Sequence, residues 1–232
     1  MAMADTNLNL LKVAVHQLLP ILDELVFVGG CVTGLLISDE AAADVRPTFD
    51  VDAIAEITSY EDYARFSNRL RELGFTEDTS EDAPVCRWRN DETRLDVLPL
   101  DEKILGFSNR WYKPAMESAQ EHEIEEDIRI RIVTAPYFCA TKLEAFKGRG
   151  GGDYLASHDL EDLITVIDGR PELLDELRIT PEDVSSYIAR AIGHLLATGG
   201  FIDALPGYLP HDESSQGRLG ILLKRLKEIS EL

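Results

Sequence analysis

The chain is poor in cysteine, and it lacks a long hydrophobic run. Its three cysteines, Cys31, Cys86 and Cys139, are widely spaced, without a CxxC pair or a histidine at metal-ligand spacing. This pattern argues against a disulfide framework and a zinc site, so we expect three buried structural thiols. No apolar stretch approaches the roughly 20 residues that span a bilayer, and the N-terminus lacks the basic, apolar and small-residue order of a signal peptide. We therefore expect a cytoplasmic protein without a membrane partner.

Positive charge is also scarce. The chain has 23 lysines and arginines against 43 aspartates and glutamates, a formal net charge of −20. Such a surface repels nucleic acid and anionic membranes, so any polyanionic partner must meet a local basic patch. The acidic residues are spread along the chain rather than gathered in a tail, which is typical of solvated helix faces. A basic partner protein is the alternative explanation.

What the chain does have is enough apolar sequence for a core, with 44% hydrophobic residues in 232. Periodicity predicts strands over 25–28, 48–57, 84–90, 93–100 and 127–134. The strands 84–90 and 93–100 are expected to form a hairpin. It predicts helices over 6–22, 31–38, 60–73, 135–149, 157–169, 170–177, 181–197 and 212–231. The predicted fold class is α+β. Residues 1–134 form a mixed β-sheet flanked by helices, and residues 135–232 form a helical bundle.

Three aspartates stand on predicted strands in positions that favour a shared site. Asp50 and Asp52 are two residues apart, so both side chains leave the same face of the sheet. Asp96, between Leu95 and Val97, follows the same alternation on a later strand. Three neighbouring carboxylates would repel one another in a cleft unless a divalent cation neutralised them, and Mg²⁺ is the usual oxygen-seeking ion. Each segment taken alone is also compatible with a solvated strand end.

Adjacent glycines, Gly29 and Gly30, follow the predicted strand 25–28 and precede a predicted helix. Paired glycines permit a close backbone approach, and a helix start presents unpaired N–H groups to an anion. A triphosphate is an anion that Mg²⁺ would also hold, and a site with two metal ions suits nucleotidyl transfer. A plain tight turn is the alternative for the glycines.

In this order the motifs resemble those of the nucleotidyltransferase superfamily of the DNA polymerase β type. The matching segments are VGGCVTG, RPTFDVDAI and TRLDVLP, with SDEAAADV as an insertion between the first two. The resemblance implies a nucleotidyltransferase-like sheet, with Asp50, Asp52 and Asp96 as catalytic residues that bind Mg²⁺, one or two ions. It implies nucleotide binding by Gly29, Gly30 and Thr33.

Within that superfamily the chain is most similar to the AbiEii-type toxins of bacterial toxin–antitoxin systems. RPTFDVD is similar to their strand entry, and ATKLEAFKGR followed by HDLEDL is similar to their two later helices. This resemblance implies that Lys142 and Asp159 contact the nucleotide and that Asp162 matches a second acidic position. The ordinary alternatives are a solvated surface lysine, a helix-capping aspartate and a structural aspartate.

The expected function is Mg²⁺-dependent transfer of NMP from an NTP, such as ATP or GTP, to an acceptor hydroxyl. The resemblance implies a toxin that modifies tRNA and is paired with an antitoxin protein. A cationic small molecule, such as an aminoglycoside or a lincosamide, fits the acidic chain better as acceptor, and a protein acceptor is also open. A different class of function is a non-catalytic module that binds a nucleotide or a partner, against which the three intact carboxylates argue.

Overall fold

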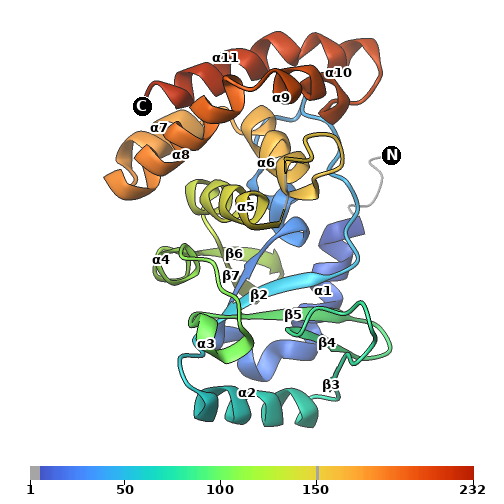
Figure 1. The fold of residues 1–232 in the computed structure, drawn as a ribbon. Coiled ribbons are helices and arrows are strands. Elements are labelled where there is room, and N and C mark those ends of the chain that lie inside the picture. Colours follow the sequence, from blue (N-terminus) through green and yellow to red (C-terminus); the bar gives the residue numbers. More distant parts are fainter. Residues whose placement is uncertain (1–5, 150–151) are drawn as a thin grey trace. The chain divides into compact units, whose positions relative to one another are not determined.

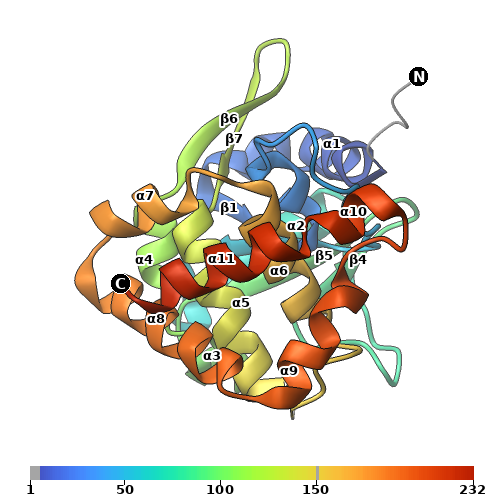
Figure 2. The ribbon, with the colours of Figure 1, turned by 90° about the horizontal axis from the view of Figure 1, so that it is seen from above.

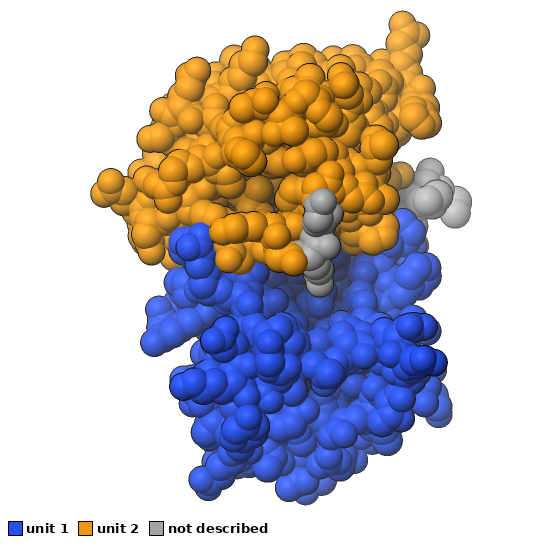
Figure 3. Space-filling model, in the orientation of Figure 1, with its two compact units in different colours: residues 1–34, 47–134 blue, residues 35–46, 135–232 orange. Residues whose placement is uncertain are grey.

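The computed structural model describes residues 6–149 and 152–232, whose contacts divide into two compact units (Figure 3). Unit 1 comprises the described residues up to Gly34 together with Pro47–Thr134. Unit 2 comprises Leu35–Arg46 and the described residues from Ala135 onward. The chain thus changes unit after Thr134, where we place the start of the helical domain. Residues 35–46, which we place in the first domain, pack instead with unit 2.

Arg170 and Arg218 explain why the 35–46 segment packs with the helices of unit 2. Arg218 donates hydrogen bonds to the Asp39 carboxylate, at 2.7 Å, and to the Ala41 carbonyl, at 3.2 Å. Arg170 donates to the Leu36 carbonyl at 2.8 Å. Backbone carbonyls of a connecting segment need such partners when they lie away from water.

Unit 1 is an α+β structure, as predicted, in which the described residues form one mixed sheet of seven strands in the order β3-β4-β5-β2-β1-β7-β6 (Figure 1). Strand β1 is antiparallel to β2 and parallel to β7, and β2 is parallel to β5. The strands are β1 Leu25–Val28, β2 Val51–Ala55, β3 Thr76–Glu77, β4 Arg87–Arg89, β5 Arg94–Pro99, β6 Gln120–Glu125 and β7 Ile128–Ile132. The helices of the unit are α1 Thr6–Leu18, η1 Leu19–Glu24, α2 Tyr60–Glu72, α3 Glu102–Leu105 and α4 Tyr112–Glu117, and η2 Gly30–Leu36 runs into unit 2.

Helix α2 covers the face of the sheet on which Trp88 lies. Ser59 caps the helix by accepting a hydrogen bond from the Asp62 amide, which satisfies one of the free N–H groups at its start. The Arg71 guanidinium lies 5.4 Å from the centre of the Trp88 ring, whose side chain is only 1% exposed. Trp88 is therefore a core residue, and its neighbour Arg87 on the same strand faces the other way.

Unit 2 is a bundle in which α5 packs on α6 and α8, and α11 packs on α6 and α8 (Figure 2). Its core contains fully buried apolar side chains such as Phe138, Leu163 and Leu226. The helices are α5 Ala135–Arg149, α6 His158–Gly169, α7 Leu173–Ile179, α8 Glu182–Leu196, α9 Gly199–Ala204, η3 Leu205–Tyr208, α10 Glu213–Gly217 and α11 Leu219–Ser230.

Several predicted elements are wrong in length or continuity. The helix predicted over 6–22 changes after Leu18 into the 3₁₀ helix η1, because Pro20 cannot donate a helical hydrogen bond. The helix expected after Gly30 is the seven-residue 3₁₀ helix η2. The strand predicted over 127–134 is β7, and it pairs antiparallel with β6. Strand β6 was not predicted, because its own sequence is mostly polar. The predicted helix 212–231 is divided into α10 and α11.

A membrane crossing requires a long helix of high mean hydropathy. Across the described residues, no single helix is long and apolar enough to cross a membrane. One pair, Glu182–Leu196 with Gly199–Tyr208, meets that requirement only when taken together, and it is bent by 86°.

Candidate active site

Four adjacent strands of unit 1 bring two of the predicted aspartates into one row. Val28 on β1 pairs with Asp52 on β2, Asp52 pairs with Asp96 on β5, and Asp96 pairs with Arg87 on β4. Residues paired in register point to the same face of a sheet. The row therefore places Asp52, Asp96 and Arg87 side by side, on the face opposite Trp88.

Arg87 joins Asp96 to the third predicted aspartate, Asp50. Its Nε and Nη2 atoms donate to the two carboxylate oxygens of Asp96, each at 2.8 Å. Nη2 also donates to Asp50 Oδ2 at 2.6 Å. This fork geometry is the strong, charge-assisted form of an arginine–carboxylate pair. Asp50 and Asp96 consequently lie within reach of one guanidinium, on the face predicted from their spacing.

At the paired glycines, the backbone of Gly29 packs closely against the side chain of Asp52. Gly29 has φ of +77°, and a Cβ atom built on it would lie 2.0 Å from Asp52 Oδ2. No side chain fits there, and the left-handed backbone disfavours any residue with a Cβ. A glycine is therefore needed at position 29, because only a residue without a Cβ atom leaves room for the Asp52 carboxylate to pack on the turn.

A buried asparagine, Asn7, forms hydrogen bonds with both the glycine turn and the segment that precedes Asp50. Asn7, on α1 and 2% exposed, accepts a hydrogen bond from the Thr48 amide at 2.9 Å and donates to the Gly30 carbonyl at 3.4 Å. The Thr48 hydroxyl in turn donates to Asp50 Oδ1 at 2.8 Å. Asn7 and Thr48 thus set the position of Asp50 relative to the glycine turn.

The electrostatics of the row follow from its burial and its charges. The hydrogen bond with Asp96 raises the pKa of Arg87, and burial opposes this only in part. Burial raises the pKa of the neighbouring Cys86 thiol to about 12, with the charges of Asp96 and Asp52 adding to the shift. Arg87 is therefore a permanent cation in this site, and Cys86 a protonated, unreactive thiol.

The donor chemistry of the three aspartates fits a divalent cation. Carboxylate oxygens are the ligands that Mg²⁺ prefers, and three carboxylates beside one guanidinium retain two negative charges. In this conformation, however, no three histidine, cysteine, aspartate or glutamate side chains of the described residues are placed to hold an ion. Arg87 already engages both oxygens of Asp96 and one of Asp50.

Thr33, predicted to bind the nucleotide, is fully buried. Its hydroxyl donates to the Gly29 carbonyl at 3.5 Å, across the first turn of η2. In this conformation Thr33 stabilises the glycine turn from within, and a direct contact with a nucleotide stays a prediction.

Lys142 and Asp159, the other predicted nucleotide contacts, belong to a buried ion-pair network in unit 2. Lys142, on α5, donates to Asp162 Oδ2 at 2.6 Å and to Asp159 Oδ1 at 3.5 Å, both on α6. Arg46 donates to the same oxygen of Asp162 at 3.2 Å. Lys142 is thus no solvated surface lysine, because its charge is compensated by two buried aspartates.

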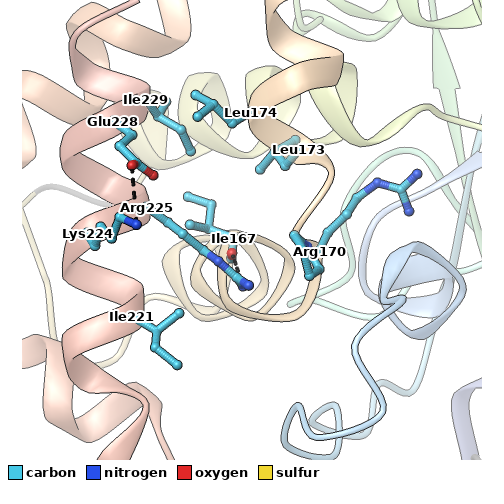
Figure 4. A pocket seen from close by; sticks show the side chains of 10 residues that line it. Ile167, Arg170, Leu173, Leu174, Ile221, Lys224, Arg225, Glu228 and Ile229 are labelled. Atoms are coloured by element: carbon cyan, nitrogen blue, oxygen red, sulfur yellow. Dashed lines mark hydrogen bonds and ion pairs between the residues drawn. The ribbon is translucent and has the colours of Figure 1, made fainter.

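Unit 2 also contains a cavity of about 270 Å³ (Figure 4). Its wall combines apolar side chains of α6, α7 and α11 with Arg170, Lys224 and Arg225. Arg225 donates to the Ile167 and Asp168 carbonyls at the end of α6, an interaction typical of helix termination. None of the predicted site residues lines this cavity.

The sequence prediction missed Arg87 and Asn7. Arg87 could have been found from the hairpin: alternation around Trp88 places it on the outer face, and counting outward from Asn90 and Thr93 pairs it with Asp96. No local signal marks Asn7, whose partners lie 23 and 41 residues away.

The chain has a nucleotidyltransferase-like α+β fold. It is similar to an antigenic nucleotidyltransferase-like protein from Paracoccidioides brasiliensis, known from a crystal structure, with a TM-score of 0.50. The match covers 87% of this chain and 92% of that one at 16% sequence identity, so the likeness is one of fold. No protein-family profile matches the sequence, and no curated protein sequence matches it either.

Proposed function

We propose that the protein is a Mg²⁺-dependent nucleotidyltransferase that transfers NMP from an NTP to an acceptor hydroxyl. The observation that carries the proposal is the row of Asp52, Asp96 and Arg87: Asp52 also packs on Gly29, and Arg87 joins Asp96 to Asp50. A nucleotidyltransferase-like fold around this row supports it.

In this proposal Asp50, Asp52 and Asp96 would hold Mg²⁺, one or two ions, which would neutralise the phosphates and polarise the acceptor hydroxyl. The acceptor oxygen forms a bond to the α-phosphorus, and the bond from that phosphorus to the bridging oxygen breaks. Pyrophosphate leaves with the electron pair of the broken bond, and the hydroxyl proton passes to water. The protein's own contribution is to hold the three carboxylates on one face, through Gly29, Thr48 and Asn7.

The turn at Gly29 and Gly30, with Thr33 behind it, would receive the triphosphate. The resemblance to AbiEii-type toxins supports a nucleotide contact for Lys142 and Asp159 as well. For Lys142 this requires that a phosphate share the lysine with Asp159 and Asp162, its partners in the structure.

Two kinds of molecule are candidates for the acceptor, and different observations favour each. The similarity to AbiEii-type toxins supports a toxin that modifies tRNA and is neutralised by an antitoxin. The net charge of −20 favours a cationic small molecule, such as an aminoglycoside or a lincosamide, over a large polyanion.

The transfer of label from each of the four α-³²P-labelled NTPs tests the proposal. Wild-type protein and Mg²⁺ are incubated separately with total tRNA, aminoglycosides and lincosamides, and a protein lysate, with Asp52→Asn as the inactive control. We expect label on one acceptor class with wild type alone. Absence of transfer from all four NTPs to all three classes would overturn the proposed function.

A further inference from the structure

We propose that Arg87 is an exchangeable cation: it neutralises Asp50 and Asp96 until Mg²⁺ and the triphosphate arrive, and it then binds a phosphate oxygen. The inference rests on the proposed function and deepens it, because it names a residue that makes metal binding depend on the nucleotide. Neither the sequence motif nor the structural likeness assigns a role to Arg87.

The geometry places Arg87 in direct competition with a metal ion. Its guanidinium makes three hydrogen bonds of 2.6–2.8 Å to the oxygens that would ligate the ion at Asp50 and Asp96. An ion that draws these two carboxylates together with Asp52 must displace the guanidinium or share its oxygens. Metal binding without a nucleotide is therefore opposed by the loss of a bidentate pair.

Charge explains why the nucleotide would relieve this opposition. A guanidinium released from two carboxylates keeps its positive charge, which is costly beside a newly bound divalent cation. A triphosphate supplies pairs of non-bridging oxygens, and two of them can accept hydrogen bonds from the same planar fork. Arg87 is 17% exposed at its side chain, so a ligand from solvent can reach its guanidinium. The exchange then makes metal and triphosphate binding mutually favourable.

Two binding measurements on Arg87→Gln, neither of them an activity assay, test the exchange. The first is titration with Mn²⁺ alone, in which EPR reports the free ion. The second is calorimetry with the preformed Mg²⁺–tripolyphosphate complex, a probe that needs no knowledge of the base. We expect Arg87→Gln to bind Mn²⁺ alone about tenfold more tightly than wild type and the tripolyphosphate complex about tenfold more weakly.

Arg89→Gln is the matched control, because Arg89 lies two residues further on the same strand and face, but pairs with Asp78 at 3.8 Å. It removes the same charge and should leave both affinities within about twofold of wild type. Arg87→Lys keeps the charge without the fork and should fall between wild type and Arg87→Gln in both titrations. This variant also serves if three unneutralised carboxylates prevent Arg87→Gln from folding, as judged by circular dichroism.

The two opposite shifts distinguish an exchange from a structural role, since damage to the fold would weaken both ligands. Unchanged or weaker Mn²⁺ binding by Arg87→Gln, or by Arg87→Lys in its place, would overturn the inference. If the Mn²⁺ shift is seen but no NTP donates NMP, the exchange stands as a metal-site property and only the proposed reaction fails.

Discussion

The carboxylate of Asp52 lies directly on Gly29, so closely that a Cβ atom on that glycine would come within 2.0 Å of Oδ2. The contact joins two segments that the chain separates by an excursion into unit 2, residues 35–46. It explains why a glycine stands at the end of β1, and it gives the position of a predicted catalytic side chain a specific structural cause.

Gly29→Ala should therefore damage both stability and the site. The left-handed backbone at φ of +77° adds about 1–2 kcal/mol of strain, and the clash with Asp52 adds to it. Gly74→Ala is the matched control: Gly74 has φ of +87° but nothing within 4 Å of its Cβ position. We expect urea unfolding to show a larger loss for Gly29→Ala, and label transfer to be lost only there. Equal losses for the two variants would contradict a steric role of Asp52.

Replacing any of the three aspartates by asparagine should abolish transfer without unfolding the protein. Each amide keeps the shape of the side chain but removes a charge from the metal site, and we expect activity to fall about a thousandfold or more. Asp91→Asn, in the exposed turn of the β4–β5 hairpin, controls for the loss of one charge. Initial rates with the labelled NTP give the comparison. Wild-type rates in Asp50→Asn or Asp52→Asn would show that the reaction does not use these carboxylates.

Lys142→Met should destabilise the protein by about 3 kcal/mol, because it leaves Asp159 and Asp162 buried with less compensating charge. Lys147→Met, an exposed site on the same helix, should change stability by less than about 0.5 kcal/mol. Chemical unfolding at neutral pH measures both. Adding Asp162→Asn to Lys142→Met should recover part of the loss. If Lys142→Met unfolds like wild type, the ion-pair network does not support the fold.

The pair formed by Arg218 and Asp39 should make stability depend on pH in the acid range. The hydrogen bond from Arg218 lowers the pKa of Asp39 below its ordinary value of 3.8. A group with a depressed folded pKa stabilises the protein above its unfolded pKa, and this stabilisation is lost as the pH falls through the folded value. Asp39→Asn should thus cost about 0.5–1 kcal/mol at pH 7, and the difference from wild type should shrink below about pH 4.

Urea unfolding of wild type and Asp39→Asn at pH 7 and pH 3 measures this difference. Asp44→Asn, in the same 35–46 segment and exposed, controls for the charge removed. A difference between wild type and Asp39→Asn that stays constant from pH 7 to pH 3 would rule out the predicted contribution of the ion pair.

Local sequence was sufficient to predict the elements that carry the site. The β-branched run before Gly29 predicts β1, and the alternation around Asp52 and Asp96 predicts that their side chains leave the core face. Strand period and turn chemistry act over a few residues, so they can be recognised without knowing the rest of the chain. Helix α6 follows for the same reason, since its apolar spacing and the cap at Ser157 are local.

Local sequence was insufficient wherever a short segment depends on a distant partner. The helix predicted over 31–38 is the 3₁₀ helix η2, Gly30–Leu36, and the 35–46 segment was placed with the wrong unit. The arginines that hold that segment come from residues 170 and 218, more than 130 positions later. Polar strand β6 was missed because its pairing with β7, rather than its own composition, makes it a strand.

The sequence by itself determined which carboxylates share a face, because side chains alternate along any extended strand. Only the tertiary structure decided what those carboxylates contact: Gly29 against Asp52, Arg87 between Asp50 and Asp96, and two buried aspartates around Lys142. Each of these contacts depends on strand order, register or helix packing between segments far apart in the chain. Such pairings are selected by the cooperative burial of the whole core, which no local pattern encodes.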